Sequence, residues 1–86
     1  MATRSIFRQV IPVNDQWHTL FLRGPIVHVA TRHEDCVEIW FIEDSAAGDE
    51  PRTLRVYGTG HAIDEPAAVH VGSAITPSGR FVWHLL

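Results

Sequence analysis

Apolar and polar residues alternate along most of this chain, and the alternation predicts a protein made of β-strands. The period is two residues, as expected where successive side chains point to opposite faces of a sheet. Prolines, glycines and short polar stretches separate the alternating runs and mark the turns. The predicted strands cover residues 6–13, 17–22, 26–31, 36–43, 52–57, 69–75 and 80–86.

The regular spacing of these strands predicts an all-β fold. We expect about six or seven short strands in an antiparallel meander that closes into a small barrel or sandwich. Residues 44–51 are expected to form a mobile loop, and residues 64–67 at most a single helical turn. The chain has 86 residues, which favours one all-β domain over residues 1–86.

The alternation also defines two faces. The first is apolar and is the predicted core: Val27, Val29, Val37, Ile39, Phe41, Leu54, Val56, Val69, Val71, Phe81, Trp83 and Leu85. The second mixes aromatic residues with histidines: His28, Glu38, Trp40, Arg55, Tyr57, His70, Val82 and His84. Such a mixture is typical of binding surfaces. The alternative is a solvated face on which the aromatic residues cover neighbouring strands.

Charge and cysteine content exclude several classes of function. The formal net charge is −3, and the seven basic residues are scattered arginines, which argues against a nucleic-acid-binding protein. Cys36 is the only cysteine, so no intramolecular disulfide is expected. No apolar run is long enough for a signal peptide or a membrane span. We therefore expect a cytoplasmic protein with no membrane partner.

One stretch combines a strand with a glycine-rich turn and a histidine. Residues 53–57 alternate in polarity, and Gly58-Thr59-Gly60-His61 follows them. Glycine adopts positive φ without steric cost, so a turn is expected there, with His61 presented beyond it. The turn amides could form an anion-binding nest with His61 or Arg55 as the counter-charge. Alternatively, His61 hydrogen-bonds main-chain groups and locks the turn.

Catalysis and metal binding have weaker support. His61 precedes Asp64 and Glu65, which could orient it as a general base, yet no serine occupies a nucleophile elbow. His33-Glu34-Asp35-Cys36 lacks the paired spacings of a zinc site, although His28, His70 and His84 share a face and could converge. We expect no catalytic residue, no metal and no cofactor.

Several motifs resemble those of a known family. The run Leu54–His61, the triplet Val71-Gly72-Ser73 and the closing Phe81-Val82-Trp83-His84 are similar to a family of short domains of unknown function. That family is encoded largely by tailed bacteriophages and prophages, and the resemblance implies an actinobacterial host for this member. Ala62 stands where the family often has proline, and Ser73 where it usually has threonine. The resemblance implies an accessory phage protein in the host cytoplasm and supplies no mechanism.

The sequence therefore favours a non-enzymatic phage accessory protein that acts by protein–protein interaction. Its partner would be a second copy, giving a homo-oligomer, or a host protein, because an open sheet leaves edge strands that accept partners. The alternative is a small-ligand or anion-binding domain centred on the turn from Gly58 to His61. The candidate interface or ligand residues are Trp40, Arg55, Tyr57, Gly58, Thr59, Gly60, His61 and His84.

Overall fold

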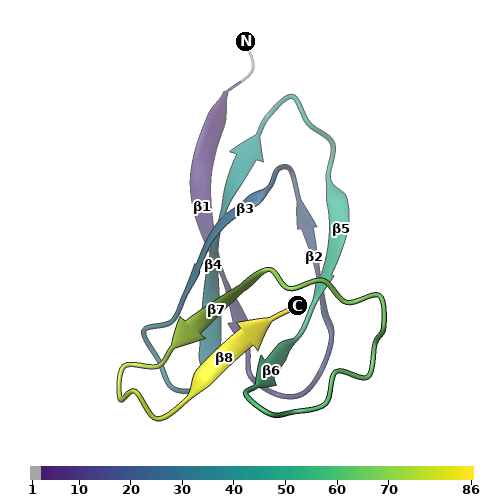
Figure 1. Ribbon diagram of the computed structural model, residues 1–86. Coiled ribbons are helices and arrows are strands. Elements are labelled where there is room, and N and C mark those ends of the chain that lie inside the picture. Colours follow the sequence, from purple (N-terminus) through teal and green to yellow (C-terminus); the bar gives the residue numbers. More distant parts are fainter. Residues whose placement is uncertain (1–2) are drawn as a thin grey trace.

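The computed structural model describes residues 3–86, and strands joined by turns and loops make up this part of the chain (Figure 1). No helix occurs among these residues, so the predicted all-β fold is confirmed. The strands are β1 (Arg4–Pro12), β2 (His18–Leu22), β3 (Ile26–Ala30), β4 (Cys36–Asp44), β5 (Glu50–Leu54), β6 (Val56–Gly58), β7 (Gly72–Ile75) and β8 (Val82–Leu85).

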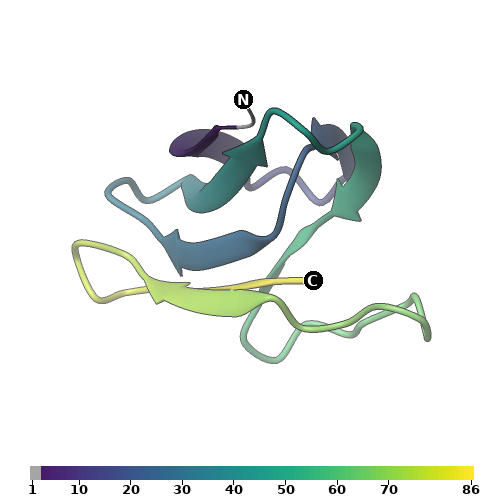
Figure 2. The same ribbon diagram turned by 90° about the horizontal axis from the view of Figure 1, so that it is seen from above.

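The strands form three small antiparallel sheets with the orders β1-β4-β3, β2-β5 and β6-β8-β7. Figures 1 and 2 show the last of these lying across one end of the first, with β7 beside β3. The predicted meander is wrong. A meander would place β2 between β1 and β3, whereas β4 lies between these two strands and β2 pairs with β5. In residues 3–86 β1 pairs with β4 alone, so the sheets do not close into a barrel.

The predicted strand over residues 52–57 is divided in two by Arg55. The main chain of Arg55 donates a hydrogen bond to Leu86 O (2.9 Å) and accepts one from Leu86 N (3.0 Å). At this point the pairing partner changes: β5 pairs with β2, whereas β6 pairs with β8. β5 and β6 therefore belong to different sheets. Residues 64–67 do not form a helical turn; Ala68 N donates to Glu65 O (3.0 Å) in a tight turn.

The core is built from strands of all three sheets. Its buried cluster consists of Ile11, Leu22, Val37, Ile39, Phe41, Leu54, Val56 and Leu85. Six of these belong to the predicted core, and three further predicted core residues, Val29, Val71 and Trp83, pack against the cluster. Val27, Val69 and Phe81 are exposed instead. Val27 lies where the register between β3 and β4 shifts, and the other two lie outside the strands, so alternation does not orient them inward.

The predicted second face is not one surface. Glu38 and Tyr57 are buried. His28 lies opposite Trp40 in the sheet of β1, β4 and β3, whereas Tyr57 lies opposite His84 in the sheet of β6, β8 and β7. Alternation assigns residues to one side of their own strand, and it does not say which strands share a sheet.

Candidate functional site

The glycine turn forms as the sequence predicts, and His61 closes it. His61 N donates to Gly58 O (3.1 Å), and Gly60 has a φ of 87°, a conformation that favours glycine. Gly58 N in turn donates to His61 Nδ1 (3.2 Å). A Cβ built on Gly58 would lie 2.8 Å from His61 Cε1, so the ring lies directly against this glycine. Because His61 already occupies the Gly58 amide, that amide is not available for an anion.

A chain of hydrogen bonds runs from the turn across the sheet of β6, β8 and β7. Thr59 Oγ1 lies 2.8 Å from His84 Nε2, His84 Nδ1 lies 2.7 Å from Ser73 Oγ, and Ser73 Oγ lies 2.9 Å from His70 Nε2. The Ser73 hydroxyl has one proton and two lone pairs, so it can donate to only one of the two imidazoles. At least one of the two facing ring nitrogens, His70 Nε2 or His84 Nδ1, therefore carries a proton.

The sequence does not indicate Ser73 as a site residue, and it indicates His70 only as a member of the second face and of the three histidines that could converge. The missing information is the register, which sets Ser73 opposite His84 on neighbouring strands. Of the three histidines that could converge, His70 and His84 lie close together, with 6.3 Å between their ring centres, whereas His28 contacts Trp40 in another sheet.

Most of the predicted site residues surround one cavity of about 280 Å³. Both the glycine turn and the pair of His70 and His84 contribute to this cavity, which we call the histidine cavity. Its lining consists of Tyr57, Gly58, Thr59, Gly60, His61, Ile63, His70, His84 and Leu86. The predicted residues Arg55 and Trp40 do not line it. Trp40 lies on β4, half-buried, with its ring 5.4 Å from the ring of His28.

Arg55 is held beside Tyr57. Its guanidinium lies 4.7 Å from the centre of the Tyr57 ring, 3.9 Å from Asp64 and 4.0 Å from Asp15. Tyr57 is 3% exposed, and its hydroxyl donates to Asp64 Oδ1 (3.0 Å). Burial and this hydrogen bond raise the pKa of the Tyr57 hydroxyl. Tyr57 is thus a packed residue whose polar end is satisfied within the chain.

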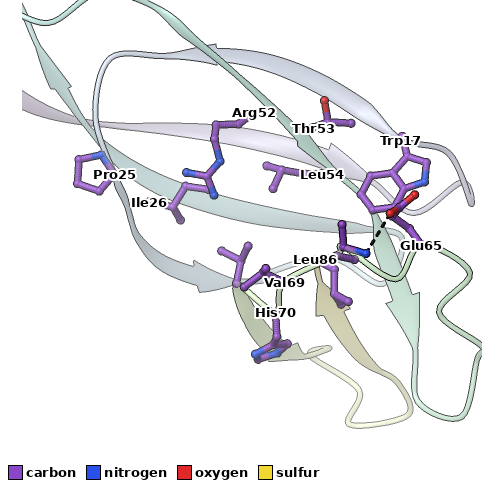
Figure 3. A pocket seen from close by; sticks show the side chains of 13 residues that line it. Trp17, Pro25, Ile26, Arg52, Thr53, Leu54, Glu65, Val69, His70 and Leu86 are labelled. Carbon is purple, nitrogen blue, oxygen red and sulfur yellow. Dashed lines mark hydrogen bonds between the residues drawn. The ribbon is translucent and has the colours of Figure 1, made fainter.

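A larger cleft of about 740 Å³ adjoins the histidine cavity (Figure 3). It lies between β5 and the loop that precedes β7, and it shares His70 and Leu86 with the smaller cavity. Apolar side chains such as Ile26, Leu54 and Val69 form much of its wall, with Arg52 directed into it in Figure 3. Glu65, at the opposite end, accepts a hydrogen bond from Ala67 N (3.0 Å).

β1 is a long edge strand with apolar side chains in solvent. All seven residues from Arg4 to Val10 are exposed, including Ile6 (64%), Phe7 (52%) and Val10 (41%). Ile6 and Phe7 are consecutive and point to opposite faces, so each face of this part of β1 leaves apolar surface in solvent. Figure 1 shows why these side chains remain exposed: the sheet of β6, β8 and β7, here called the C-terminal sheet, crosses the other end of the β1-β4 ladder.

The direction of the backbone groups in β1 follows from the bonds at its two ends. Thr3 O accepts from Ser45 N (2.9 Å), and Val13 N donates to Asp35 O (2.9 Å), so the odd-numbered residues face β4. The register between them is unbroken, and antiparallel pairing alternates. The main-chain N–H and C=O groups of Arg4, Ile6, Arg8 and Val10 therefore point away from β4, toward solvent.

A buried carboxylate fastens β1 to β4. Glu38 is fully buried, and Arg32 binds it through Nε (2.9 Å) and Nη2 (2.8 Å), while Arg8 of β1 contacts it from the other side. The hydrogen bonds from Arg32, together with those from Arg8, outweigh burial and lower the Glu38 pKa from 4.5 to about 2. Arg8 is thereby ion-paired at the exposed edge, in a cluster of two arginines and one carboxylate that keeps one net positive charge.

The remaining features give no support to metal or thiol chemistry. Residues 3–86 contain no group of three or more histidine, cysteine or acidic side chains arranged to hold a metal ion. Burial, followed by the charge of Asp35, raises the pKa of the Cys36 thiol, which disfavours the reactive thiolate. None of the described segments is a helix of sufficient length and hydrophobicity to span a membrane.

Comparison with known proteins places the chain in a family without assigning it an activity. No curated protein and no solved structure matches it. One family model matches residues 2–86, which is nearly the whole chain. The chain therefore belongs to the family described as a domain of unknown function, DUF7352.

Proposed function

We propose that this protein acts non-enzymatically, by protein–protein interaction, and that it associates with itself through the outer edge of β1. The observation that carries the proposal is that β1 combines outward backbone groups with exposed apolar side chains on both faces. Unpaired edges of this kind are templates for another strand. Strand addition would satisfy the backbone groups and bury Ile6 and Phe7 in one step.

The usual protections of an edge strand are sparse on β1. Natural edges are kept short, bulged, charged or interrupted by proline. β1 has nine residues and an unbroken register, and Pro12 stands at its very end. Its central charge, Arg8, is paired with Glu38. An edge left this open in a folded protein supports a role in binding.

Native mass spectrometry of wild type and Ile6→Pro tests the proposal. Proline at position 6 removes an N–H that points to solvent and leaves the ladder to β4 intact, as Pro12 already does on the same side. We expect a discrete oligomer for wild type and a monomer for Ile6→Pro. Phe21→Ser is the matched control, because Phe21 is equally exposed (67%) but lies on β2. A monomeric wild type, or equal loss in the control, would overturn the proposal.

A second candidate is binding of a small anion at the histidine cavity. The observation in its favour is the hydrogen-bonded chain from Thr59 to His70, which presents hydroxyl and imidazole groups beside an open cavity. The occupied Gly58 amide counts against a nest, so the donors would be the side chains.

Titration with orthophosphate, followed by NMR of the histidine side chains, tests this second candidate. A bound anion predicts saturating shifts of His84 and His61 in wild type and their loss in Ser73→Ala, which interrupts the chain. Shifts that grow linearly with phosphate, in wild type and variant alike, would show ionic-strength effects alone. Substitution of His61 separates the candidates, because self-association through β1 does not require it.

The biological setting belongs to the proposal as well. The resemblance of the Gly-Thr-Gly-His turn and the closing Val-Trp-His residues to phage and prophage sequences supports a phage-encoded accessory protein working in the host cytoplasm. Detection of the gene within a prophage and of its product in the soluble fraction of the host tests this setting.

A further inference from the structure

We infer that β1 pairs with β1 of a second copy in antiparallel register about a two-fold axis at Phe7. This inference rests on the proposed self-association and specifies its geometry. The axis would stand perpendicular to the sheet, so that β3-β4-β1 of one protomer continues into β1-β4-β3 of its partner. Such an isologous contact closes after two copies and gives a dimer.

Parity restricts the registers that are possible. Only even-numbered residues of β1 have outward backbone groups, so even-numbered residues must pair with even-numbered residues across the contact. If most of the exposed residues 4–10 are to pair, the two-fold axis must then pass through Ile6, Phe7 or Arg8. The three registers differ in which side chains and which backbone groups they bring together.

The register centred on Phe7 satisfies the whole edge. Ile6 then faces the Arg8 position, and Arg4 faces the Val10 position, so every outward N–H and C=O from residue 4 to residue 10 gains a partner. Centred on Arg8, the strands would set Arg4 opposite Pro12, which has no N–H to give. Centred on Ile6, they would set Val10 opposite residue 2, which lies outside β1 (Arg4–Pro12).

Charge favours the same register. The register at Ile6 places Arg4 opposite Arg8, and the register at Arg8 places two Arg8 residues opposite each other, and like charges directly opposite are destabilising. At Phe7 no arginine faces another arginine. The aliphatic part of Arg8 would cover Ile6, while the Arg8 guanidinium remains at Glu38.

The aromatic side chain at the axis completes the contact. Phe7 is 52% exposed although its ring already packs against Phe41 at 6.5 Å between centres. Across the axis the two Phe7 side chains form a directly opposed pair without hydrogen bonds between their backbones, the pair type with the closest side chains. Each ring would then cover the exposed part of the other.

Cysteine cross-linking distinguishes the three registers. In a Cys36→Ser background, the variants Ile6→Cys, Phe7→Cys and Arg8→Cys each place a thiol at one candidate axis. A residue at the axis lies directly opposite its copy, with Cα atoms about 4.5–5.5 Å apart, which suits a disulfide. A residue one position from the axis is displaced from its copy by two residues along the strand, and its Cα–Cα distance exceeds the ~7 Å that a disulfide can bridge. We expect efficient dimer formation on mild oxidation for Phe7→Cys alone.

The outcomes separate this inference from the proposed function. Selective cross-linking of Ile6→Cys or Arg8→Cys would overturn the Phe7 register and leave association through β1 standing. A wild-type oligomer in native mass spectra with no cross-link at any of the three positions would overturn the two-fold contact. A monomeric wild type would overturn both. Circular dichroism of each variant confirms that the sheet remains folded before oxidation.

Discussion

Glu38 is a charged residue with no exposed surface, and its two arginines determine what it contributes to stability. Its pKa is about 2 in the folded protein against 4.5 for an unperturbed group. A lowered folded-state pKa stabilises the fold above about pH 4.5, and this contribution disappears as the pH falls toward 2. At neutral pH the shift corresponds to about 3 kcal/mol.

Glu38→Gln therefore tests a residue-scale claim. We expect the free energy of unfolding of the variant to be about 2–3 kcal/mol lower than that of wild type at pH 7, because two arginines lose their counter-charge. The difference should shrink from pH 4.5 downward and be mostly lost at about pH 2, where Glu38 in the folded wild type is about half protonated. Urea unfolding of both proteins at several pH values measures it, and a constant difference would contradict the account.

His61 is expected to support the turn. His61→Ala removes the acceptor of the Gly58 amide, and a buried amide without a partner costs about 1–2 kcal/mol. Urea unfolding should report this loss, while native mass spectra should show unchanged association. Unchanged stability with lost association would mean that His61 belongs to the interface.

At the scale of elements, the packing of β7 on β3 depends on Gly72. A Cβ at this position would lie 2.6 Å from Val29 Cγ2 and 2.8 Å from Val29 Cβ, so the two sheets approach here as closely as glycine permits. We expect Gly72→Ala to cost about 1–3 kcal/mol through overpacking. Gly48→Ala is the control, since a Cβ there meets nothing within 4 Å. Equal stability of both variants would show that this contact is not tight.

Most strands could be predicted from the sequence, because alternation and turn residues are local signals. The strands from Ile26 and from Cys36 begin where the pattern predicts. The division at Arg55 could not be predicted, since it depends on a main-chain pairing with Leu86, far along the chain. The same limit applies to the site: the Gly-Thr-Gly-His turn is a local motif, whereas Ser73 joins it only through the register of β7 and β8.

At the scale of the molecule, the arrangement of sheets explains why β1 is open. The protein is flat, with extents of 45 × 29 × 16 Å, and the C-terminal sheet crosses only one end of the β1-β4 ladder. An open sheet always has two edge strands, but the sequence does not indicate which strands they are. β1 is an edge because β4 lies between β1 and β3. Self-association through β1 would bury the apolar residues that this arrangement leaves in solvent.

Amide hydrogen exchange in β1, measured by NMR at low and high protein concentration, tests this account most directly. The amides of Phe7 and Gln9 point toward β4 and should be protected at both concentrations. Those of Ile6, Arg8 and Val10 point outward and should exchange rapidly in dilute protein and slowly in concentrated protein. Rapid exchange of these outward amides at every concentration, alongside protected Phe7 and Gln9, would contradict association through the edge of β1.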